Sequence, residues 1–343
     1  MEQKKSELLL GIDLGTSRTL VMSNRGAKAM ISSVIGYPKD LIGMKLLGDV
    51  KAIGDDAVAR RSYLDIFMPL ENGVLKEASE RDMQAARELL KHAVSHAQPD
   101  KNDKVCGIIG VPARASLASK GALLGMAREV MDMALVLSEP FMVAYHLGCL
   151  KNSVVVDIGA GTIDICGMKG FMPGPKDQVT ILKGGNSIDE ALRRVISEHH
   201  RDVLITTHLA KTIKENHSFI GDAPGAQLVQ LRAEGHPVER DLTEEIRAAC
   251  ETILPDIVEQ LAIIIAGFDP EDQEEALQNI YLAGGGSNIR GLDRAIEAQM
   301  KDYVSVKVRR VPDPDYAGCA GGLKLAMDLP PQYWPQLGET IGK

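Results

Sequence analysis

Two segments far apart in the chain repeat one pattern: an apolar run, then Asp-x-Gly, then small or hydroxylated residues. They are GIDLGTSRT at Gly11–Thr19 and VVVDIGAGTIDI at Val154–Ile165. The apolar runs predict buried strands, and the glycines predict a tight turn after each strand. Because glycine has no Cβ, backbone N–H groups in such a turn can point at an anion. The two copies, with Asp13 and Asp157 lying 144 residues apart, indicate a duplicated half-domain that grips one phosphate chain from both sides.

Length and charge limit the classes of function. A chain of 343 residues can form two or three domains with a large core. The net charge is -8 and no basic tract with interleaved aromatic residues is present, so nucleic acid is not an expected partner. The five cysteines are far apart without C-x-x-C spacing, which is typical of reduced thiols in a cytosolic protein.

Membrane insertion is not expected either. The first residues, Met1–Glu7, are polar and contain no apolar core of signal-peptide length. The longest apolar stretches, such as Leu261–Gly267, are too short to span a bilayer. We therefore expect a cytoplasmic protein that meets a membrane only through a partner or a surface patch.

The apolar pattern predicts the same order of elements in both halves of the chain. The expected strands are Leu8–Asp13, Leu20–Ser23, Ala29–Ile35, Val105–Val111, Ala134–Leu137, Val154–Ile158, Ile163–Met168, Val179–Lys183 and Asn279–Ala283. The expected helices are Glu77–Val94, Ser116–Met133, one with a capping box at Ser187–Glu190, one near Leu292, and one from Thr243 towards Leu261 that Pro255 kinks or divides. No strong helical period is present in Tyr37–Gly54.

The two turns predict a nucleotide site. Asp13 and Asp157 would face each other across a cleft, and two facing carboxylates repel unless a cation such as the Mg²⁺ of a nucleoside triphosphate lies between them. Backbone N–H donors to the phosphates would come from Gly15, Thr16 and Ser17 and from Gly159, Ala160, Gly161 and Thr162. The hydroxyls of Thr16, Ser17 and Thr162 would add donors. The turn of Gly284, Gly285, Gly286 and Ser287 would let a flat base or ribose approach closely.

Each of these pieces alone is most often a plain turn. Their order along the chain is what carries the prediction: phosphate turn, strand followed by Glu-Pro, second phosphate turn and triple-glycine turn. The segments GIDLGTSRT, LSEPFMVAYHLG, VVVDIGAGTIDI and LAGGGSNIRGL resemble the phosphate-1, connect-1, phosphate-2 and adenosine motifs of the actin-like ATPase superfamily.

The resemblance covers nearly the whole chain. PLENGVL at Pro69–Leu75 and GGNSIDEAL at Gly184–Leu192 are similar to segments of the bacterial MreB-type actins. VIGYPKDLIGMKLLGD at Val34–Asp49, VPARAS at Val111–Ser116 and LPPQYW at Leu329–Trp334 resemble the magnetosome actin-like branch of that family.

This resemblance implies an α/β fold: an actin-like, duplicated ribonuclease-H-like, two-lobed ATPase with a nucleotide cleft between its lobes. Lobe I would comprise residues 1–145 plus 314–343, with a small subdomain at about 34–76. Lobe II would comprise residues 146–313, with a small inserted subdomain at about 185–245.

The resemblance also implies roles for single residues. Glu139, in Ser-Glu-Pro, occupies the place of the residue that polarises the attacking water. Asp157 corresponds to the phosphate-2 aspartate associated with Mg²⁺ and hydrolysis, and Asp13 is its phosphate-1 counterpart, in the same segment as Arg18. Lys211 stands where MreB-type proteins usually carry a nucleoside-contacting glutamate, so Lys214 and Glu215 are candidates for that contact.

The expected function is a cytoskeletal ATPase that uses ATP and Mg²⁺, polymerises with ATP into cytoplasmic filaments and depolymerises after hydrolysis. Its partners would be further copies of itself and magnetosome-associated proteins, so that the filaments organise and position magnetosomes in chains. An MreB-like cell-shape filament and a plasmid-segregating filament remain alternatives. A sugar or acetate kinase of the same fold is a further alternative, although no second motif for an acceptor pocket is evident.

Overall fold

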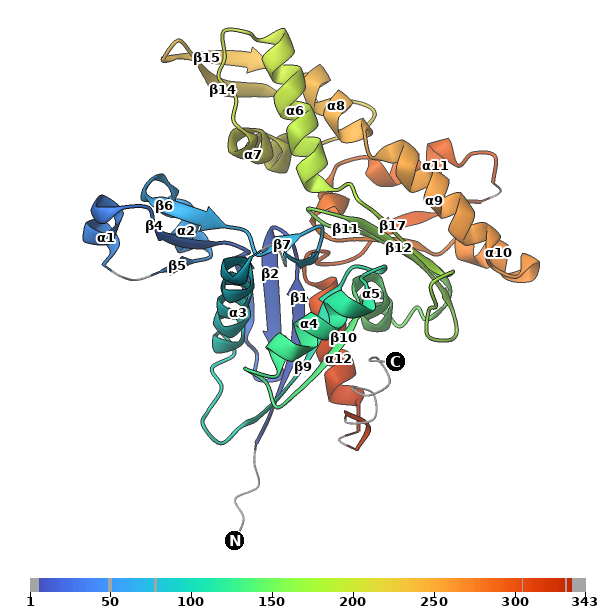
Figure 1. Ribbon diagram of the computed structural model, residues 1–343. Coiled ribbons are helices and arrows are strands. Elements are labelled where there is room, and N and C mark those ends of the chain that lie inside the picture. Colours follow the sequence, from blue (N-terminus) through green and yellow to red (C-terminus); the bar gives the residue numbers. More distant parts are fainter. Residues whose placement is uncertain (1–5, 49–50, 77–78, 304, 331, 335–343) are drawn as a thin grey trace. The chain divides into compact units, whose positions relative to one another are not determined.

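The computed structural model describes residues 6–48, 51–76, 79–303, 305–330 and 332–334 (Figure 1). The chain divides into two compact units. The first unit contains Met1–Cys149 and Tyr316–Lys343, and the second contains Leu150–Asp315. The small subdomain expected within each lobe stays a prediction.

The first unit is built on a five-stranded mixed sheet. Its strands, in spatial order, are β10 (Met133–Ser138), β9 (Lys104–Val111), β1 (Glu7–Leu14), β2 (Arg18–Ser23) and β3 (Lys28–Ser32). β1 pairs antiparallel with β2 and parallel with β9, while β3 continues the antiparallel side and β10 the parallel side.

The second unit repeats this sheet. Its strands, in spatial order, are β13 (Gln178–Ile181), β12 (Ile163–Lys169), β11 (Lys151–Ile158), β16 (Ile280–Ala283) and β17 (Val308–Arg310). β11 pairs antiparallel with β12 and parallel with β16, with β13 and β17 outside them. Taken from its other end, this sheet has the same order and strand directions as the first: β17, β16, β11, β12 and β13 correspond to β10, β9, β1, β2 and β3. This correspondence confirms the duplication predicted from the two Asp-x-Gly segments.

Helices cover both faces of the first sheet because its central strands are apolar on both sides. Along β9, Val105, Ile109 and Val111 pack in the cluster that contains buried residues of α3 (Glu80–Ser95) and α4 (Leu117–Ala127). Cys106 and Ile108 face the other way, with residues of α5 (Glu139–Leu147) and α12 (Ala317–Asp328). This alternation follows from the two-residue period of a strand.

Short elements follow β3 in the first unit (Figure 1). They are β4 (Ile35–Pro38), α1 (Leu41–Leu47), β5 (Ala52–Ile53), α2 (Asp55–Ala59), η1 (Arg61–Tyr63), β6 (Leu64–Phe67), β7 (Leu70–Glu71) and β8 (Val74–Leu75). The helix α1 forms within Tyr37–Gly54, although the sequence shows no strong helical period there. Asp40 caps α1 by accepting hydrogen bonds from the N–H groups of Ile42 and Gly43. Only Gly43 of this helix is buried, so no apolar stripe marked it in the sequence.

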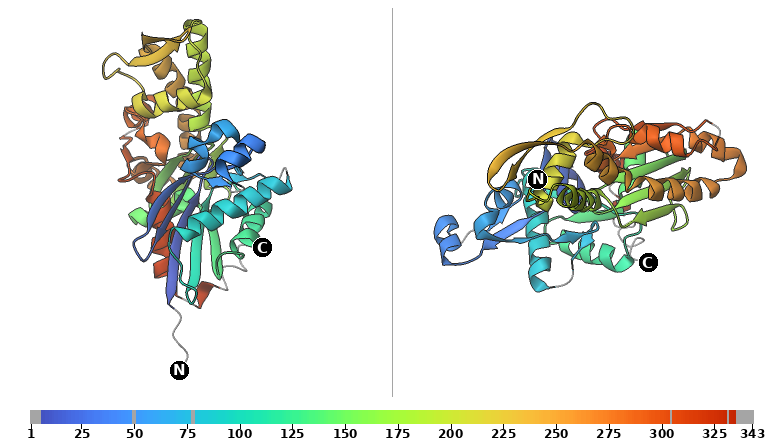
Figure 2. Two further views of the ribbon diagram at one scale, coloured as in Figure 1. Left: turned by 90° about the vertical axis from the view of Figure 1, so that its left-hand side faces the viewer. Right: turned by 90° about the horizontal axis from the view of Figure 1, so that it is seen from above.

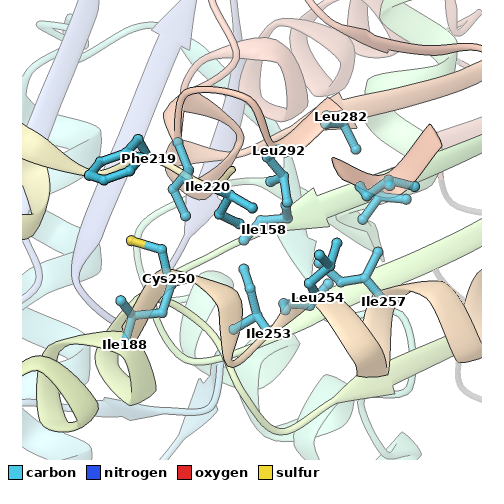
Figure 3. Packing of buried hydrophobic residues seen from close by; sticks show 14 of the residues in the cluster. Ile158, Ile188, Phe219, Ile220, Cys250, Ile253, Leu254, Ile257, Leu282 and Leu292 are labelled. Carbon is cyan, nitrogen blue, oxygen red and sulfur yellow. The ribbon is translucent and has the colours of Figure 1, made fainter. Parts of the chain in front are cut away.

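In the second unit, helices pack on the sheet and on a hairpin. The helices are α6 (Gly185–His199), α7 (Thr207–His217), α8 (Thr243–Glu251), α9 (Leu254–Ala266), α10 (Pro270–Leu277), η2 (Gly285–Asn288) and α11 (Leu292–Gln299). The hairpin consists of β14 (Leu228–Ala233) and β15 (His236–Asp241), and is the golden pair of strands beside α6 in Figure 2. Figure 3 shows the shared core, where Ile158 at the end of β11 lies close to Ile220 and Leu292.

Several predicted boundaries need correction. The helix expected at Ser116–Met133 ends at Ala127, because Asp132 exchanges hydrogen bonds with the backbone of Val105 and starts the pairing of β10 with β9. The helix expected from Thr243 is divided into α8 and α9, with Pro255 in the first turn of α9 as its missing N–H allows. The start expected at Glu77 lies outside the described residues.

Candidate functional site

The two Asp-x-Gly turns have the same geometry. In the first, the N–H of Gly15 donates to the carbonyl of Arg18 at 3.1 Å. In the second, the N–H of Gly159 donates to the carbonyl of Thr162 at 2.9 Å. These two N–H groups therefore already have carbonyl acceptors, and the phosphate donors expected from each turn reduce to the residues that follow the glycine.

The first unit places Asp13 and Glu139 at one edge of its sheet. Asp13 pairs with Gly110 of β9, and Gly110 pairs with Leu137 of β10, two residues before Glu139. Glu139 is the first residue of α5 and its side chain is half-buried. A Cβ on Gly110 would lie 2.9 Å from the Cγ of Glu139, so the absence of a side chain at residue 110 leaves room for Glu139.

The hydroxyl of Thr16 ties the first turn to the hairpin of β7 and β8. Its Oγ1 accepts a 2.7 Å hydrogen bond from the N–H of Gly73 and keeps its own hydrogen for another acceptor. Ser33 holds the turn from the other side by donating to the carbonyl of Gly15 at 2.7 Å. Gly73 and Ser33 were not predicted as site residues, because no local sequence pattern links them to the turn.

The second unit brings Asp157 next to the triple-glycine turn. Asp157 pairs with Ala283, the residue that precedes Gly284. Gly284 has a φ of 74°, and a Cβ there would clash with the Oδ1 of Asp157 and lie 2.6 Å from the carbonyl oxygen of Ile158. Glycine is therefore required at residue 284 both by its left-handed backbone and by this close approach.

The second phosphate turn also rests on the start of α6. The N–H of Gly185 donates to the carbonyl of Gly159 at 3.0 Å, and the N–H of Asn186 donates to the carbonyl of Ala160 at 2.8 Å. The predicted capping box at Ser187 is wrong, because α6 begins at Gly185 and Ser187 lies in its first turn, where its hydroxyl accepts from the N–H of Gly184. The helix starts earlier because the phosphate turn supplies carbonyl acceptors for its first N–H groups.

Thr162 uses its hydroxyl inside the protein. Its Oγ1 donates to Asp164 at 2.8 Å, and Thr180 donates to the other carboxylate oxygen of Asp164 at 2.5 Å. Asp164 is 1% exposed and pairs with Asp157 across the hairpin. The hydroxyl hydrogen of Thr162 is thus donated to Asp164, a residue that the sequence analysis did not single out, and the role of Thr162 as a phosphate donor stays a prediction.

Lys214 and Glu215 differ in their surroundings. The Nζ of Lys214 lies 2.7 Å from the Oδ1 of Asp189 and donates to the carbonyl of Gly185 at 2.8 Å. Burial raises the pKa of Asp189, and the Lys214 ammonium opposes that shift. Glu215, the next residue on α7, is exposed.

Asp315 is a second carboxylate that the sequence analysis missed. Its Oδ1 lies 3.0 Å from where a Cβ of Gly285 would be, and its Oδ2 lies 3.5 Å from the side-chain amide of Asn288. Arg310 donates to the Oδ1 of Asn288 at 3.2 Å. The triple-glycine turn is therefore flanked by Asp315, in the segment after β17, and by Arg310, the last residue of β17.

The cysteines are free, and burial raises the pKa of Cys106 to about 11 and those of Cys166 and Cys250 to about 12. Among the residues that the structure describes, no group of three or more His, Cys, Asp or Glu side chains could hold a metal ion. In the same part of the chain, none of the helices combines the length and apolarity needed to cross a bilayer.

The duplicated sheets, each with an Asp-x-Gly turn after its first strand, define an actin-like fold. The sequence profile of the MreB/Mbl protein family matches residues 7–330, and the chain belongs to this family. It is 52% identical over 341 residues to the actin-like protein MamK of Magnetospirillum gryphiswaldense, which covers 99% of this chain and 95% of that protein.

Solved structures agree with this family. The chain is 50% identical to a structure described as a MamK double helical filament, with a TM-score of 0.93 over 95% of this chain and 100% of the other. It is also 50% identical to a non-polymerising MamK mutant bound to AMPPNP, with a TM-score of 0.74 over 94% of this chain and 99% of the other.

Proposed function

We propose that this protein is an ATPase that polymerises with ATP into cytoplasmic filaments and depolymerises after hydrolysis. The observation that carries the proposal is the matched pair of turns at Gly15–Arg18 and Gly159–Thr162, one in each half of the duplicated fold. The relative described as a filament supports polymerisation, and the relative described as bound to AMPPNP supports nucleotide binding.

The two turns would act on the phosphates of one nucleotide. Gly15, Thr16, Ser17 and Arg18 in one unit, and Gly159, Ala160, Gly161 and Thr162 in the other, would surround the phosphate chain. The turn of Gly284, Gly285, Gly286 and Ser287, together with Glu215, would contact the nucleoside. Lys214 makes its contacts within the protein, with Asp189 and Gly185.

The residues present fit Mg²⁺. This ion keeps several waters and takes only one or two protein carboxylates beside substrate phosphates, so it does not need a three-residue cluster. Asp13 and Asp157, each at the end of the first strand of its sheet, would supply those carboxylates. The bound ion would neutralise charge on the phosphates.

Glu139 would orient the attacking water. Phosphoryl transfer depends on positioning and charge neutralisation, so a carboxylate that accepts a hydrogen bond from the water is sufficient and no covalent nucleophile is needed. Glu139 is suited to this role because it is fixed at the first position of α5, at the same sheet edge as Asp13.

Exposed apolar side chains support assembly. On α1, Leu41, Ile42 and Leu46 are 82%, 68% and 63% exposed. In the second unit, Phe171 and Met172 are 62% and 60% exposed in the loop after β12. Apolar surface of this kind commonly marks a contact with another protein, and repeated head-to-tail contacts make an open filament.

Magnetosomes are the proposed cargo, on the basis of the sequence segments shared with the magnetosome actin-like branch.

The test is Glu139→Ala, measured for phosphate release and for sedimentation with ATP. We expect phosphate release to fall by about a hundredfold while filaments still form and persist, because the nucleotide still binds. The control is Glu80→Ala, since Glu80 is also the first residue of a helix after a serine cap in the same unit but is exposed. Unchanged phosphate release in Glu139→Ala would remove Glu139 from this role. A wild-type protein that stays in the supernatant and consumes ATP only when a sugar or acetate is added, by transferring the phosphoryl group to that acceptor and releasing ADP, would be a kinase instead.

A further inference from the structure

Lys214 forms a buried ion pair on the inner side of α7. Its side chain is 13% exposed and that of its partner Asp189 on α6 is 2% exposed. The ammonium is held by two protein acceptors, the Asp189 carboxylate at 2.7 Å and the carbonyl of Gly185 at 2.8 Å. The contact with Asp189 is an ion pair, and the contact with Gly185 is a hydrogen bond in which the ammonium donates, both within the second unit.

Gly185 connects this ion pair to the phosphate turn. Its carbonyl accepts from Lys214, and its N–H donates to Gly159 at 3.0 Å. Space is limited on both sides, because a Cβ on Gly185 would lie 2.9 Å from the Nζ of Lys214, and a Cβ on Gly184 would lie 2.7 Å from the carbonyl oxygen of Gly159. A displacement of the ammonium would therefore reach the turn through a single residue.

We propose that Lys214 is a positioning residue for the phosphate turn, which it holds through Gly185, rather than a contact to the nucleoside. This inference rests on the proposed nucleotide site and assigns a different role to one of its candidate residues. Asp189 on α6 contributes to this positioning, because its carboxylate fixes the Lys214 ammonium. The start of α6 is thereby held against the carbonyls of Gly159 and Ala160.

The energetics of a buried ion pair shape the choice of variants. Removing only the lysine leaves a buried carboxylate without its partner, which destabilises the fold by itself. Replacing both partners with neutral side chains of similar size largely avoids that penalty. The informative protein is therefore the double variant Lys214→Met with Asp189→Asn, studied in the full chain and compared with Lys214→Met alone.

The chain offers a matched control pair. The Nζ of Lys169 lies 2.7 Å from the Asp177 carboxylate and also donates to the carbonyl of Gly267 at 2.7 Å. Its side chain and that of Asp177 are 20% and 11% exposed, in the same unit. Lys169→Met with Asp177→Asn thus removes the same kind of pair, but one that holds the β12–β13 loop and α9 rather than α6.

Two measurements separate positioning from other roles. Hydrogen exchange measures how strongly the backbone N–H groups of Gly185 and Asn186 are protected. These N–H groups donate to the carbonyls of the phosphate turn, so their exchange rate reports whether the start of α6 stays bound to that turn. Affinity is measured with AMPPNP and Mg²⁺. In the Lys214/Asp189 double variant we expect these amides to exchange faster without nucleotide and the Kd to rise about tenfold, which is about 1.4 kcal/mol. The Lys169/Asp177 control should change neither.

Each other result overturns the inference. A higher Kd with unchanged exchange at Gly185 and Asn186 would mean that Lys214 contacts the nucleotide directly. Faster exchange with an unchanged Kd would mean that the contact of Lys214 with Gly185 does not affect nucleotide binding. Equal effects in the control would mean that any such ion pair acts through stability alone. A wild-type protein that does not bind AMPPNP would overturn the proposed function itself, which is a distinct result.

Discussion

At the scale of residues, several carboxylates in this chain are held by a few specific side-chain partners. Asp164 is held by two threonine hydroxyls, Asp189 by Lys214, and Asp103 by Arg25. A buried or partly buried carboxylate needs such partners because its desolvation is costly. The partner of each lies at a different distance along the sequence, so these assignments come from the fold.

Asp103 gives a pH-dependent prediction. Arg25 donates to both of its carboxylate oxygens, at 2.7 Å and 2.6 Å. These bonds, together with a weaker effect of the hydrogen bond from the N–H of Asp100, lower the pKa of Asp103 from 3.8 to about 2. A carboxylate whose pKa is lowered by folding stabilises the folded state above its unfolded pKa and loses this contribution as the pH falls. The free energy of unfolding of wild type minus that of Asp103→Asn should therefore be constant above about pH 5 and shrink as the pH falls through 3.8 towards about 2.

Urea unfolding at a series of pH values measures this difference. The variant Asp222→Asn, at an exposed position, serves as the control for the removal of one carboxylate. A constant difference between wild type and Asp103→Asn across the acid range would show that the Arg25 bonds do not act on the proton affinity of Asp103.

At the scale of elements, the helix α1 combines an apolar sequence with a solvent-exposed position. Its residues LIGMKLL are apolar, yet Leu41, Ile42, Met44 and Leu46 are 43% to 82% exposed. A short helix with no buried stripe gains little from its own unit, and tertiary packing normally stabilises helices of this length. Its apolar surface is therefore best explained by a contact made during assembly.

This explanation predicts the effect of Ile42→Glu. The free energy of unfolding should change by less than about 0.5 kcal/mol, because Ile42 is 68% exposed. The protein concentration needed for assembly with ATP should instead rise about tenfold or more. Sedimentation across a protein concentration series measures the second effect, and thermal unfolding checks the first. Leu117→Glu, at the 64% exposed start of α4, is the control and should assemble like wild type. Normal sedimentation of Ile42→Glu would exclude α1 from the assembly contact.

At the scale of the whole molecule, the duplication explains why one ligand should stabilise two units. Each unit has its own hydrophobic core and its own Asp-x-Gly turn, so each is expected to unfold cooperatively by itself. A nucleotide bound by both turns would stabilise both units by mass action.

The single tryptophan makes this testable. Trp334 is 4% exposed and packs with Met142 and Ala326 in the first unit, so its fluorescence reports that unit, while circular dichroism reports both. With AMPPNP and Mg²⁺ at about 100 times the Kd, binding should add about 2.7 kcal/mol to the free energy of unfolding of the bound protein. The unfolding transitions followed by tryptophan fluorescence and by circular dichroism should therefore both move to higher temperature. Mg²⁺ alone is the control. A part of the circular dichroism transition that does not shift would show that one unit takes no part in binding.

The sequence by itself determined the features that depend on local chemistry. Alternation of apolar residues and the Asp-x-Gly turns predicted the strands β1, β2, β11 and β12 and the duplication, because strand period and turn chemistry are read within a few residues. Resemblance predicted the family, which the profile match and the relatives confirm. The roles of Glu139, Asp13 and Asp157 stay predictions.

Only the tertiary structure decided which atoms of those motifs are already in use. The N–H groups of Gly15 and Gly159 close their own turns, the hydroxyl of Thr162 belongs to Asp164, and the ammonium of Lys214 belongs to Asp189 and Gly185. The exposure of α1 was decided in the same way, since an apolar sequence does not say whether its own chain covers it. Hydrogen-bond partners distant in sequence compete for the same donor, and that competition is settled only when the packed fold brings them together.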